Sequence, residues 1–160
     1  MPRFEILVYN KSKEKLPFSR RKLQTIIEKV LFFLKEKKPV SISLIFVDPV
    51  QFKKIRTFWL KEDKQGSILS FPYQTKQDVF PLLNQEKKDL GDIFFSIKNL
   101  KKEAKGLKVS FKDYFLELLI HGLLHLYGFE HKKKEDWVKM EKKEKLIFKK
   151  IKNILCALLI

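Results

Sequence analysis

Three histidines lie close together in the stretch HGLLHLYGFEH, from His121 to His131, and the chain has no others. His121 and His125 are four residues apart, so on a helix both side chains leave the same face, one turn apart. Gly128 can then end the helix in the left-handed conformation and turn the chain back, which lets His131 supply a third nitrogen. The spacing predicts a site in which three imidazoles bind one metal ion.

Three neutral imidazoles leave a zinc ion with its full charge and an open coordination position, which is typical of catalytic zinc sites. One Zn²⁺ per chain is therefore the expected cofactor. Zinc peptidases with the spacing H-E-x-x-H-x-x-G-x-x-H place a glutamate general base where this chain has Gly122. Peptide hydrolysis is therefore disfavoured, whereas a site without a carboxylate suits an anionic phosphodiester.

The net charge of the chain favours the same class of substrate. The sequence contains 35 Lys plus Arg against 19 Asp plus Glu, which gives a formal charge of +16. Such a charge favours a polyanionic partner such as RNA or a ribosome. Nearly all of it is lysine, however, and an AT-rich genome also produces that bias without any ligand.

Length and cysteine content predict one cytoplasmic domain spanning residues 1–160. A chain of 160 residues is long enough to bury a core without disulfides. The single Cys156 excludes an internal disulfide, and the first residues contain no apolar stretch of signal-peptide length. The apolar segment Ile154–Ile160 is far shorter than the roughly 20 residues that span a bilayer, so we expect no membrane role and expect this segment to pack on the core.

The hydrophobic pattern predicts alternating strands and helices, and hence a small α/β or α+β fold with helices packed on a mixed sheet. Tyr73–Leu90 has a weak pattern and is predicted to be mainly loop. The predicted strands are Phe4–Tyr9, Val40–Val47, Ile68–Phe71 and Asp92–Ile97.

Capping residues set the predicted helix ends. Ser110 followed three residues later by Asp113 has the form of a capping box, at the start of the helix that carries the histidines. The last helix is expected to bury one face, formed by Trp137, Met140, Leu146, Ile147, Ile151 and Leu155. The predicted helices run from Ser19 to Leu34, from Asp48 to Trp59, from Asn99 to Lys105 with Gly106 after it, from Ser110 to Leu126 and from Lys134 to Leu158.

Several stretches carry a resemblance to a known family. HGLLHLYGFEH resembles the H-G-x-L-H-L-x-G-Y-D-H signature of the YbeY family, single-domain bacterial proteins described as metal-dependent, single-strand-specific endoribonucleases. ILSFPY (68–73) is similar to the family's T-D-V-L-S-F-P segment, and LGDIFFS (90–96) to its L-G-D-I strand. Met140 with Glu144 fits its C-terminal helix, so the resemblance covers roughly the last two thirds of the chain.

The resemblance implies a fold, a metal site and a function. The implied fold is a mixed, mostly parallel sheet of about four strands packed with about five helices. His121, His125 and His131 are the implied zinc ligands. The implied function is maturation of ribosomal RNA, including the 3′ end of 16S RNA, and ribosome quality control, so RNA and the ribosome are the expected partners, without DNA specificity.

Three departures from the family pattern bear on mechanism. Leu60 stands where the family usually has an arginine that is thought to serve catalysis, Gly66 and Ser67 replace a Thr-Asp pair, and Phe129 with Glu130 replaces Tyr-Asp. Arg56, one helical turn before Leu60, and Lys61 beside it are candidates to contact the same anion. The alternative is that both are ordinary solvated charges at a helix end.

Other polar residues are candidates to support the site. Glu117 lies one turn before His121, where it can orient a ligand, act as a base through a water or complete the coordination sphere in a resting state. The alternative is that it has no role at the site, because a glutamate four residues from a histidine is common on helices. Ser70 and Asp92 match family positions, and Glu130 keeps the carboxylate of the family's aspartate. All three are expected to support the ligands; the alternative for Ser70 and Asp92 is that a buried serine and a strand-end aspartate are routine structural residues. The sequence thus favours a zinc-dependent endoribonuclease, with an impaired RNA-binding relative that keeps a structural metal as the main alternative and a zinc peptidase as a third.

Overall fold

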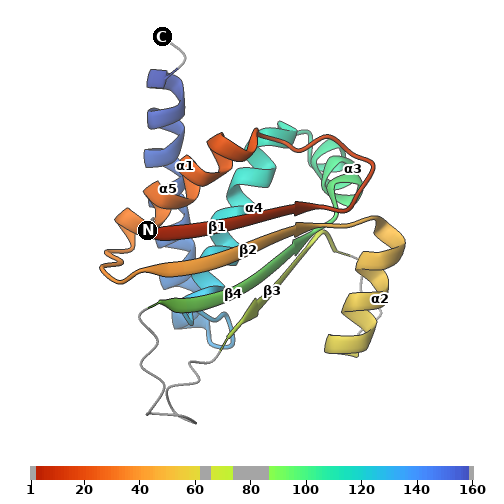
Figure 1. Ribbon diagram of the computed structural model, residues 1–160, viewed down its shortest axis with the longest axis horizontal. Helices are drawn as coiled ribbons and strands as arrows, with labels where there is room; N and C mark the ends of the chain where they lie inside the picture. Colours follow the sequence, from red (N-terminus) through yellow and green to blue (C-terminus); the bar gives the residue numbers. More distant parts are fainter. Residues whose placement is uncertain (1–2, 62–65, 74–86, 159–160) are drawn as a thin grey trace.

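A four-stranded sheet organises the chain in the computed structural model, which describes residues 3–61, 66–73 and 87–158 (Figure 1). The strand order is β1-β2-β4-β3, with β1, β2 and β4 parallel and β3 antiparallel to β4. The described residues therefore form one small domain with a mixed, mostly parallel sheet, as predicted. The strands are β1 (Phe4–Asn10), β2 (Val40–Phe46), β3 (Ile68–Pro72) and β4 (Lys88–Phe95).

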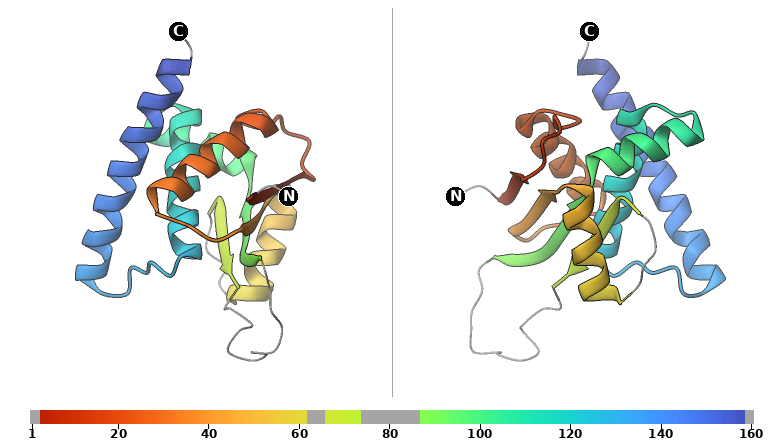
Figure 2. Two further views of the ribbon diagram at one scale, coloured as in Figure 1. Left: turned by 60° about the vertical axis from the view of Figure 1, so that its left-hand side comes forward. Right: turned by 90° about the vertical axis from the view of Figure 1, so that its right-hand side faces the viewer.

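Helices cover both faces of the sheet unequally, with α2 alone on one face and the others on the opposite face (Figure 2). The side-chain alternation of β2 explains this division, because Ile42, Leu44 and Phe46 join the large core while Ile45 packs on the α2 side. The helices are α1 (Arg20–Phe33), α2 (Pro49–Leu60), α3 (Ile97–Leu107), α4 (Phe111–Leu126) and α5 (Lys134–Leu158).

The main core lies between the sheet and the layer that contains α4. Its centre is aromatic: Phe46 and Phe95 stack at 5.3 Å between ring centroids, and Phe115 of α4 packs at 5.0 Å from Phe95. All three side chains are buried. The burial fixes α4 against the sheet, and α4 carries two of the three histidines.

A second, smaller cluster holds α2 on the other face. Phe52 is the one buried residue of α2, and it packs with Val47 and Leu69. Ile55 of α2 and Phe71 of β3 join this cluster partly exposed. Because α2 buries so little, most of its side chains face solvent.

The predicted boundaries need correction around β4 and α3. β4 begins at Lys88 rather than Asp92, because its backbone pairs with β2 from Val40↔Lys88 onward, with a register shift between Ser41 and Ile42. Lys88–Leu90 is thus strand, while 74–86 of the predicted loop lies outside the described residues. The strand ends at Phe95 because the next residue caps the following helix.

α3 is longer at both ends than the sequence predicts. The Ser96 hydroxyl accepts a hydrogen bond from the Asn99 N–H, so the helix begins at Ile97. It continues through Gly106 and ends only where Lys108 adopts the left-handed conformation, with φ of 56°. The predicted stop at Gly106 was therefore wrong.

α5 matches its predicted range but buries a narrower face than predicted. Met140, Ile147 and Ile151 are buried and Leu155 packs partly on the core, whereas Trp137 and Leu146 are more than half exposed. The reason is that α5 packs mainly along α4 and extends past the rest of the molecule at its C-terminal end (Figure 1). The apolar C-terminal segment is also only partly buried. Leu155 packs on the core, whereas Leu158 is 66% exposed, and residues 159–160 lie outside the described range.

Among the helices of the described residues, none is long and apolar enough to cross a bilayer.

Candidate metal centre

The helix that carries the histidines begins as the sequence predicts. The Ser110 hydroxyl accepts a hydrogen bond from the Asp113 N–H, which is half of a capping box. The Asp113 carboxylate instead accepts a hydrogen bond from Lys152 of α5, at 2.6 Å. That contact links the start of α4 to the C-terminal half of α5. The two helices are thus held together at the end of α4 that lies away from the histidines.

Gly122 allows α4 to approach the sheet closely. A Cβ added at Gly122 would lie 3.0 Å from both Ile68 Cδ1 and Ser70 Oγ of β3, and 3.2 Å from Ile93 Cδ1 of β4. The position occupied by the base of a zinc peptidase therefore faces a packed sheet in this protein. A glutamate there requires the side chains of Ile68, Ser70 and Ile93 to shift.

The end of α4 brings the third histidine to the first two. The N–H groups of Tyr127, Gly128 and Phe129 donate to carbonyls of the last helical turn, and Gly128 has a φ of +87°. This is the left-handed turn that the sequence predicts at this glycine. The chain then reverses and places His131 against the exposed side of the helix.

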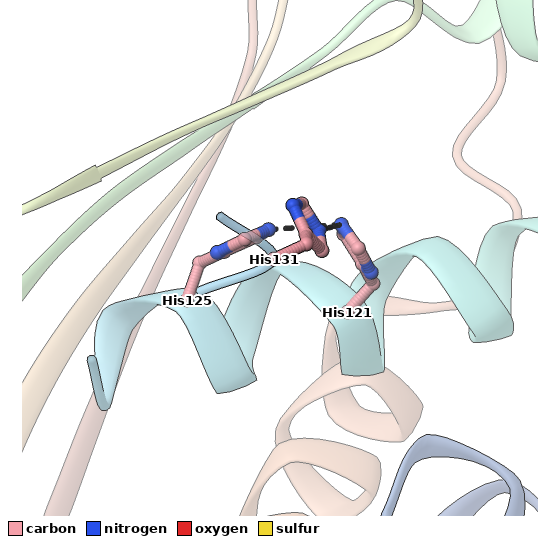
Figure 3. A group of neighbouring side chains, drawn as sticks. All are labelled: His121, His125 and His131. Carbon is pink, nitrogen blue, oxygen red and sulfur yellow. Dashed lines mark hydrogen bonds between the residues drawn. The ribbon is translucent and has the colours of Figure 1, made fainter. Parts of the chain in front are cut away.

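The Nε2 atoms of the three imidazoles converge on one point (Figure 3). His121 Nε2 lies 2.9 Å from His125 Nε2 and 3.2 Å from His131 Nε2. Tetrahedral zinc with Zn–N bonds of about 2.0–2.1 Å requires nitrogens about 3.3 Å apart, so the cluster needs to open only slightly to hold the ion. His121 and His125 are partly buried and His131 is exposed, so one side faces solvent.

The second nitrogens of two imidazoles are held by hydrogen bonds. Nδ1 of His125 donates to the Phe129 carbonyl at 2.8 Å, and Nδ1 of His121 donates to the Glu144 carboxylate of α5. These acceptors keep the protons on Nδ1 and leave the Nε2 lone pairs facing the common point. Burial, together with the charges of the neighbouring imidazoles, lowers the pKa of His125, which also favours the neutral, ligating form. The donor set therefore fits Zn²⁺.

A pocket of about 600 Å³ opens beside the histidines, between α4 and the edge formed by β3 and α2. His121 and His125 form part of its wall. Arg56 and Leu60 of α2 and Lys88 of β4 contribute two cations and one apolar side chain. The remaining wall comes mainly from β3 and from the chain just after α4, namely 68–73 and 126–130.

Some of the predicted supporting residues reach this pocket. Arg56, Ser70 and Glu130 all line it, and Glu130 also lies 3.5 Å from Lys132. Ser70 points toward α4, where its Oγ lies 3.0 Å from the Cβ position of Gly122. Lys61 ends α2 in the left-handed conformation, and its side chain is exposed. It is not among the described residues that line the pocket.

Glu117 and Asp92 are not among the described residues that line the pocket. Glu117 is an exposed side chain of α4. Partial desolvation of its carboxylate, together with the charges of Asp113 and Glu144, raises its pKa. Asp92 pairs with Phe71 in the sheet, while Ile93 and Ser70 face α4, so Asp92 points to the face that carries α2. There it accepts a hydrogen bond from the Tyr73 hydroxyl, at 2.5 Å.

Glu144 is the site residue that the sequence argument did not assign. It is partly buried on α5, one turn after the buried Met140, and it contacts His121 across 23 positions in sequence. A carboxylate one turn from a core residue of the last helix was the available signal. Its partner was not predictable, because the contact depends on how α5 packs against α4.

Comparison with known proteins identifies a family. A family model described as endoribonuclease YbeY matches residues 8–152. The chain belongs to the endoribonuclease YbeY family. An endoribonuclease YbeY of Phytoplasma mali is 30% identical over 92% of this chain and 88% of its own length. That of Agrobacterium fabrum is 37% identical over 68% of this chain, a match that spans 62% of the relative.

The fold also resembles a solved structure. A Thermotoga maritima protein known from its solution structure superposes with a TM-score of 0.63, at 21% identity, over 95% of this chain and 92% of that one. The resemblance covers nearly all of the YbeY-family domain described above. At this identity it supports the fold alone.

The departures from the YbeY pattern have structural counterparts. Leu60 lines the pocket from the last turn of α2, one turn after Arg56. A Cβ at Gly66, where the family has threonine, would overlap the Arg56 guanidinium. Ser67, in place of the family's aspartate, is buried and donates to Glu103 of α3 at 2.7 Å.

Proposed function

We propose that this protein is a zinc-dependent endoribonuclease that cleaves single-stranded RNA in the cytoplasm, as one domain over residues 1–160 with one Zn²⁺ per chain. The observation that carries the proposal is the convergence of three Nε2 atoms at the wall of a pocket that also contains Arg56 and Lys88. Metal-assisted cleavage of a phosphodiester uses both features, a Lewis acid and cations that stabilise the charge on its oxygens. Membership of the YbeY family supports the same reaction.

The substrate we propose is ribosomal RNA, in maturation that includes the 3′ end of 16S RNA and in ribosome quality control. The net charge of +16 supports a partner with many phosphates, such as the ribosome. The names of the relatives support the endoribonuclease activity, and the choice of ribosomal RNA rests on the resemblance to the family.

In this proposal His121, His125 and His131 hold the ion and Glu144 keeps the His121 ring in its ligating tautomer. When bound, zinc supplies a Lewis acid and a water of lowered pKa. Ser70 and Glu130 shape the wall of the pocket. Glu117, whose raised pKa suits a group that exchanges protons, is the proposed base and acts through a water because its side chain lies outside the pocket wall.

Arg56 is the proposed replacement for the family arginine. It lines the pocket one turn from Leu60, and its guanidinium occupies the space that a threonine at 66 would need. In this proposal the two departures, Leu60 and Gly66, follow from one change, a guanidinium that lines the pocket from the preceding turn of α2. Lys61 remains a weaker candidate, because it is exposed at the end of α2.

Leu60 also supports the second candidate function, an RNA- or ribosome-binding relative that keeps its metal and has lost catalysis. The experiment is cleavage of a fluorescent single-stranded RNA by the full chain, with chelator and with zinc added back. Cleavage that chelator stops and zinc restores is the expected result. RNA binding with no cleavage in any condition would select the binding protein instead. A peptidase is disfavoured by the packing at Gly122.

Two variants test the role of Arg56 in the same assay. Arg56→Ala is expected to lower the cleavage rate by about 100-fold, as removal of a charge-stabilising group typically does. Adding Leu60→Arg to that variant is expected to restore part of the rate. If Arg56→Ala keeps the full rate while zinc remains bound, Arg56 is a surface charge, and Lys61→Ala becomes the next test.

A further inference from the structure

We propose that Trp59 and Tyr73 form a base-stacking platform beside the metal centre, where unpaired bases of an RNA strand stack while its backbone lies in the pocket. The platform consists of these two side chains, with Phe58 and Phe71 as their neighbours. The inference rests on the proposed function for its substrate, and it adds the residues that recognise bases.

The exposure of these aromatic side chains is the first observation. Phe58 is 74% exposed, Trp59 64% and Tyr73 46%. Three consecutive large apolar residues, 58 to 60, end α2 on the surface, although α2 has a core face available at Phe52. A concentrated aromatic surface next to a pocket is typical of a binding site.

The second observation is that the platform is held in place. The Trp59 ring meets the Phe71 ring edge-on at 6.0 Å, and Phe71 in turn packs on Phe94 at 5.7 Å in the small core cluster. The Tyr73 hydroxyl donates to Asp92, and this bond raises the pKa of Tyr73 to about 12, so the donor stays protonated at neutral pH. An oriented ring loses little conformational entropy when a base stacks on it.

The third observation is continuity with the metal centre. Phe71 and Tyr73 line the same pocket as His121 and His125, and Leu60 connects them to Trp59 along α2. Because the Tyr73 hydroxyl reaches Asp92 on the α2 face of the sheet, a strand whose phosphate lies by the histidines reaches the platform by passing over the edge strand β3. Duplex RNA has its bases already stacked inside the helix, so the platform favours a single strand.

Charge identifies the occupant as nucleic acid rather than a protein. The sequence of α2 contains Lys53, Lys54 and Arg56 and no acidic residue, and Lys61 follows directly. Aromatic rings interleaved with cations are the combination that binds single-stranded nucleic acid, by stacking on bases and by contact with phosphates. An uncharged apolar protein surface would gain nothing from these four cations.

The test uses Trp59 as its own reporter. The chain has two tryptophans, so Trp137→Phe leaves Trp59 as the single source of tryptophan emission. The full-length chain is treated with chelator, so that RNA is bound and not cut, and titrated with a short single-stranded oligouridylate. Stacking is expected to quench the Trp59 emission, and the same backbone with abasic positions is expected to bind without quenching.

Affinity measurements provide the second arm. Trp59→Ala and Tyr73→Ala are each expected to weaken binding of single-stranded RNA about tenfold, with little change for duplex RNA, and Trp59→Phe is expected to retain most of the affinity. Phe32→Ala on α1 is the matched control, because Phe32 is 71% exposed and also packs edge-on against a neighbouring ring. Zinc content of each variant, measured without chelator, checks its fold.

The proposal would be overturned if the Trp59 emission did not change on RNA binding, or if Trp59→Ala and Tyr73→Ala lost as much affinity for abasic RNA as for intact RNA. The aromatic surface would then be assigned to a protein partner. The outcome is independent of cleavage. Quenching in the chelated protein, together with no cleavage by the same protein when zinc is present, would refute the endoribonuclease and keep the platform. Chelator-sensitive cleavage that is indifferent to Trp59→Ala and Tyr73→Ala would refute the platform and keep the enzyme.

Discussion

At the scale of single residues, the metal centre depends on the hydrogen bonds that the Nδ1 atoms of the imidazoles donate. Glu144 accepts from Nδ1 of His121 and the Phe129 carbonyl accepts from Nδ1 of His125. Each acceptor fixes one tautomer and makes the ligating nitrogen more basic. One acceptor is a side chain that can be removed, so its contribution to metal affinity is measurable.

Glu144→Ala is expected to weaken zinc binding by about 10- to 100-fold, because loss of the acceptor frees the His121 ring to rotate and change tautomer. Competition with a fluorescent zinc chelator measures the affinity. Glu141→Ala is the control, since Glu141 lies on the same helix and pairs with Lys145 rather than with a histidine. Equal zinc affinities for the two variants would show that Glu144 does not orient the ligand.

The residue scale also shows what the sequence can and cannot predict. The histidine cluster was predictable, because an i, i+4 pair followed by a helix-ending glycine is a local pattern. The partner of Asp92 was not, since the face to which Asp92 points is set by its register with Phe71 across two strands. Glu144 depends in the same way on helix packing, so sequence-local reasoning misses it.

At the scale of elements, the packing of α4 on β3 determines where the histidines lie. Gly122 is the contact point, with Ile68 and Ser70 beneath it. The caps at Ser110 and Gly128 set the ends of α4 and were predictable from residue type. The earlier start of β4 was not, because Lys88 joins the sheet only through pairing with β2.

Gly122→Glu tests this contact. The new side chain meets β3 and carries a charge into a packed layer, so the free energy of unfolding is expected to fall by at least about 2 kcal/mol, without any peptidase activity. Gly106→Glu on α3 is the matched control, because nothing lies within 4 Å of its Cβ position, and it is expected to change stability by less than about 1 kcal/mol. Urea unfolding measures both, and a fully stable Gly122→Glu would contradict the close approach.

A hydrogen bond between the ends of two elements gives the protein a predicted pH dependence. The Tyr127 hydroxyl, after α4, donates to Glu36, after α1, at 2.7 Å. Burial alone would raise the pKa of Glu36, but this bond, with the N–H groups of Lys37 and Lys38, lowers it below 4.5. The stabilisation is therefore present above pH 4.5 and is lost as the pH falls through the lowered pKa.

Tyr127→Phe is expected to reduce the free energy of unfolding by about 1 kcal/mol at pH 7. The difference in the free energy of unfolding between variant and wild type is expected to become smaller as the pH falls below 4.5. Urea melts at a series of pH values provide the comparison. A difference that stays constant down to the acid-unfolding limit would show that the bond is not linked to ionisation of Glu36.

At the scale of the whole molecule, the net charge of +16 predicts how RNA binding responds to salt. Exposed lysines are distributed over the surface, among them Lys142, Lys145 and Lys149 of α5. Each phosphate contact releases counterions, so the logarithm of the affinity falls with the logarithm of salt concentration with a slope of about −0.7 per contact for a single strand.

A strand that contacts about four phosphates is therefore expected to show a slope near −3, and chelation of the metal should leave this slope almost unchanged. Fluorescence anisotropy between about 50 and 200 mM salt measures it. An affinity that does not vary with salt would show that the lysines are a compositional bias and do not hold the RNA backbone.

The central claim is that three imidazoles bind the metal that cuts RNA. Elemental analysis of zinc in the purified wild type and in His121→Ala, His125→Ala and His131→Ala tests it most directly, with circular dichroism to confirm that each variant folds. The account predicts about one zinc per wild-type chain and little zinc in the folded variants, each of which also loses RNA cleavage. Stoichiometric zinc in His125→Ala, or a wild type that cuts RNA at full rate without metal, would contradict it.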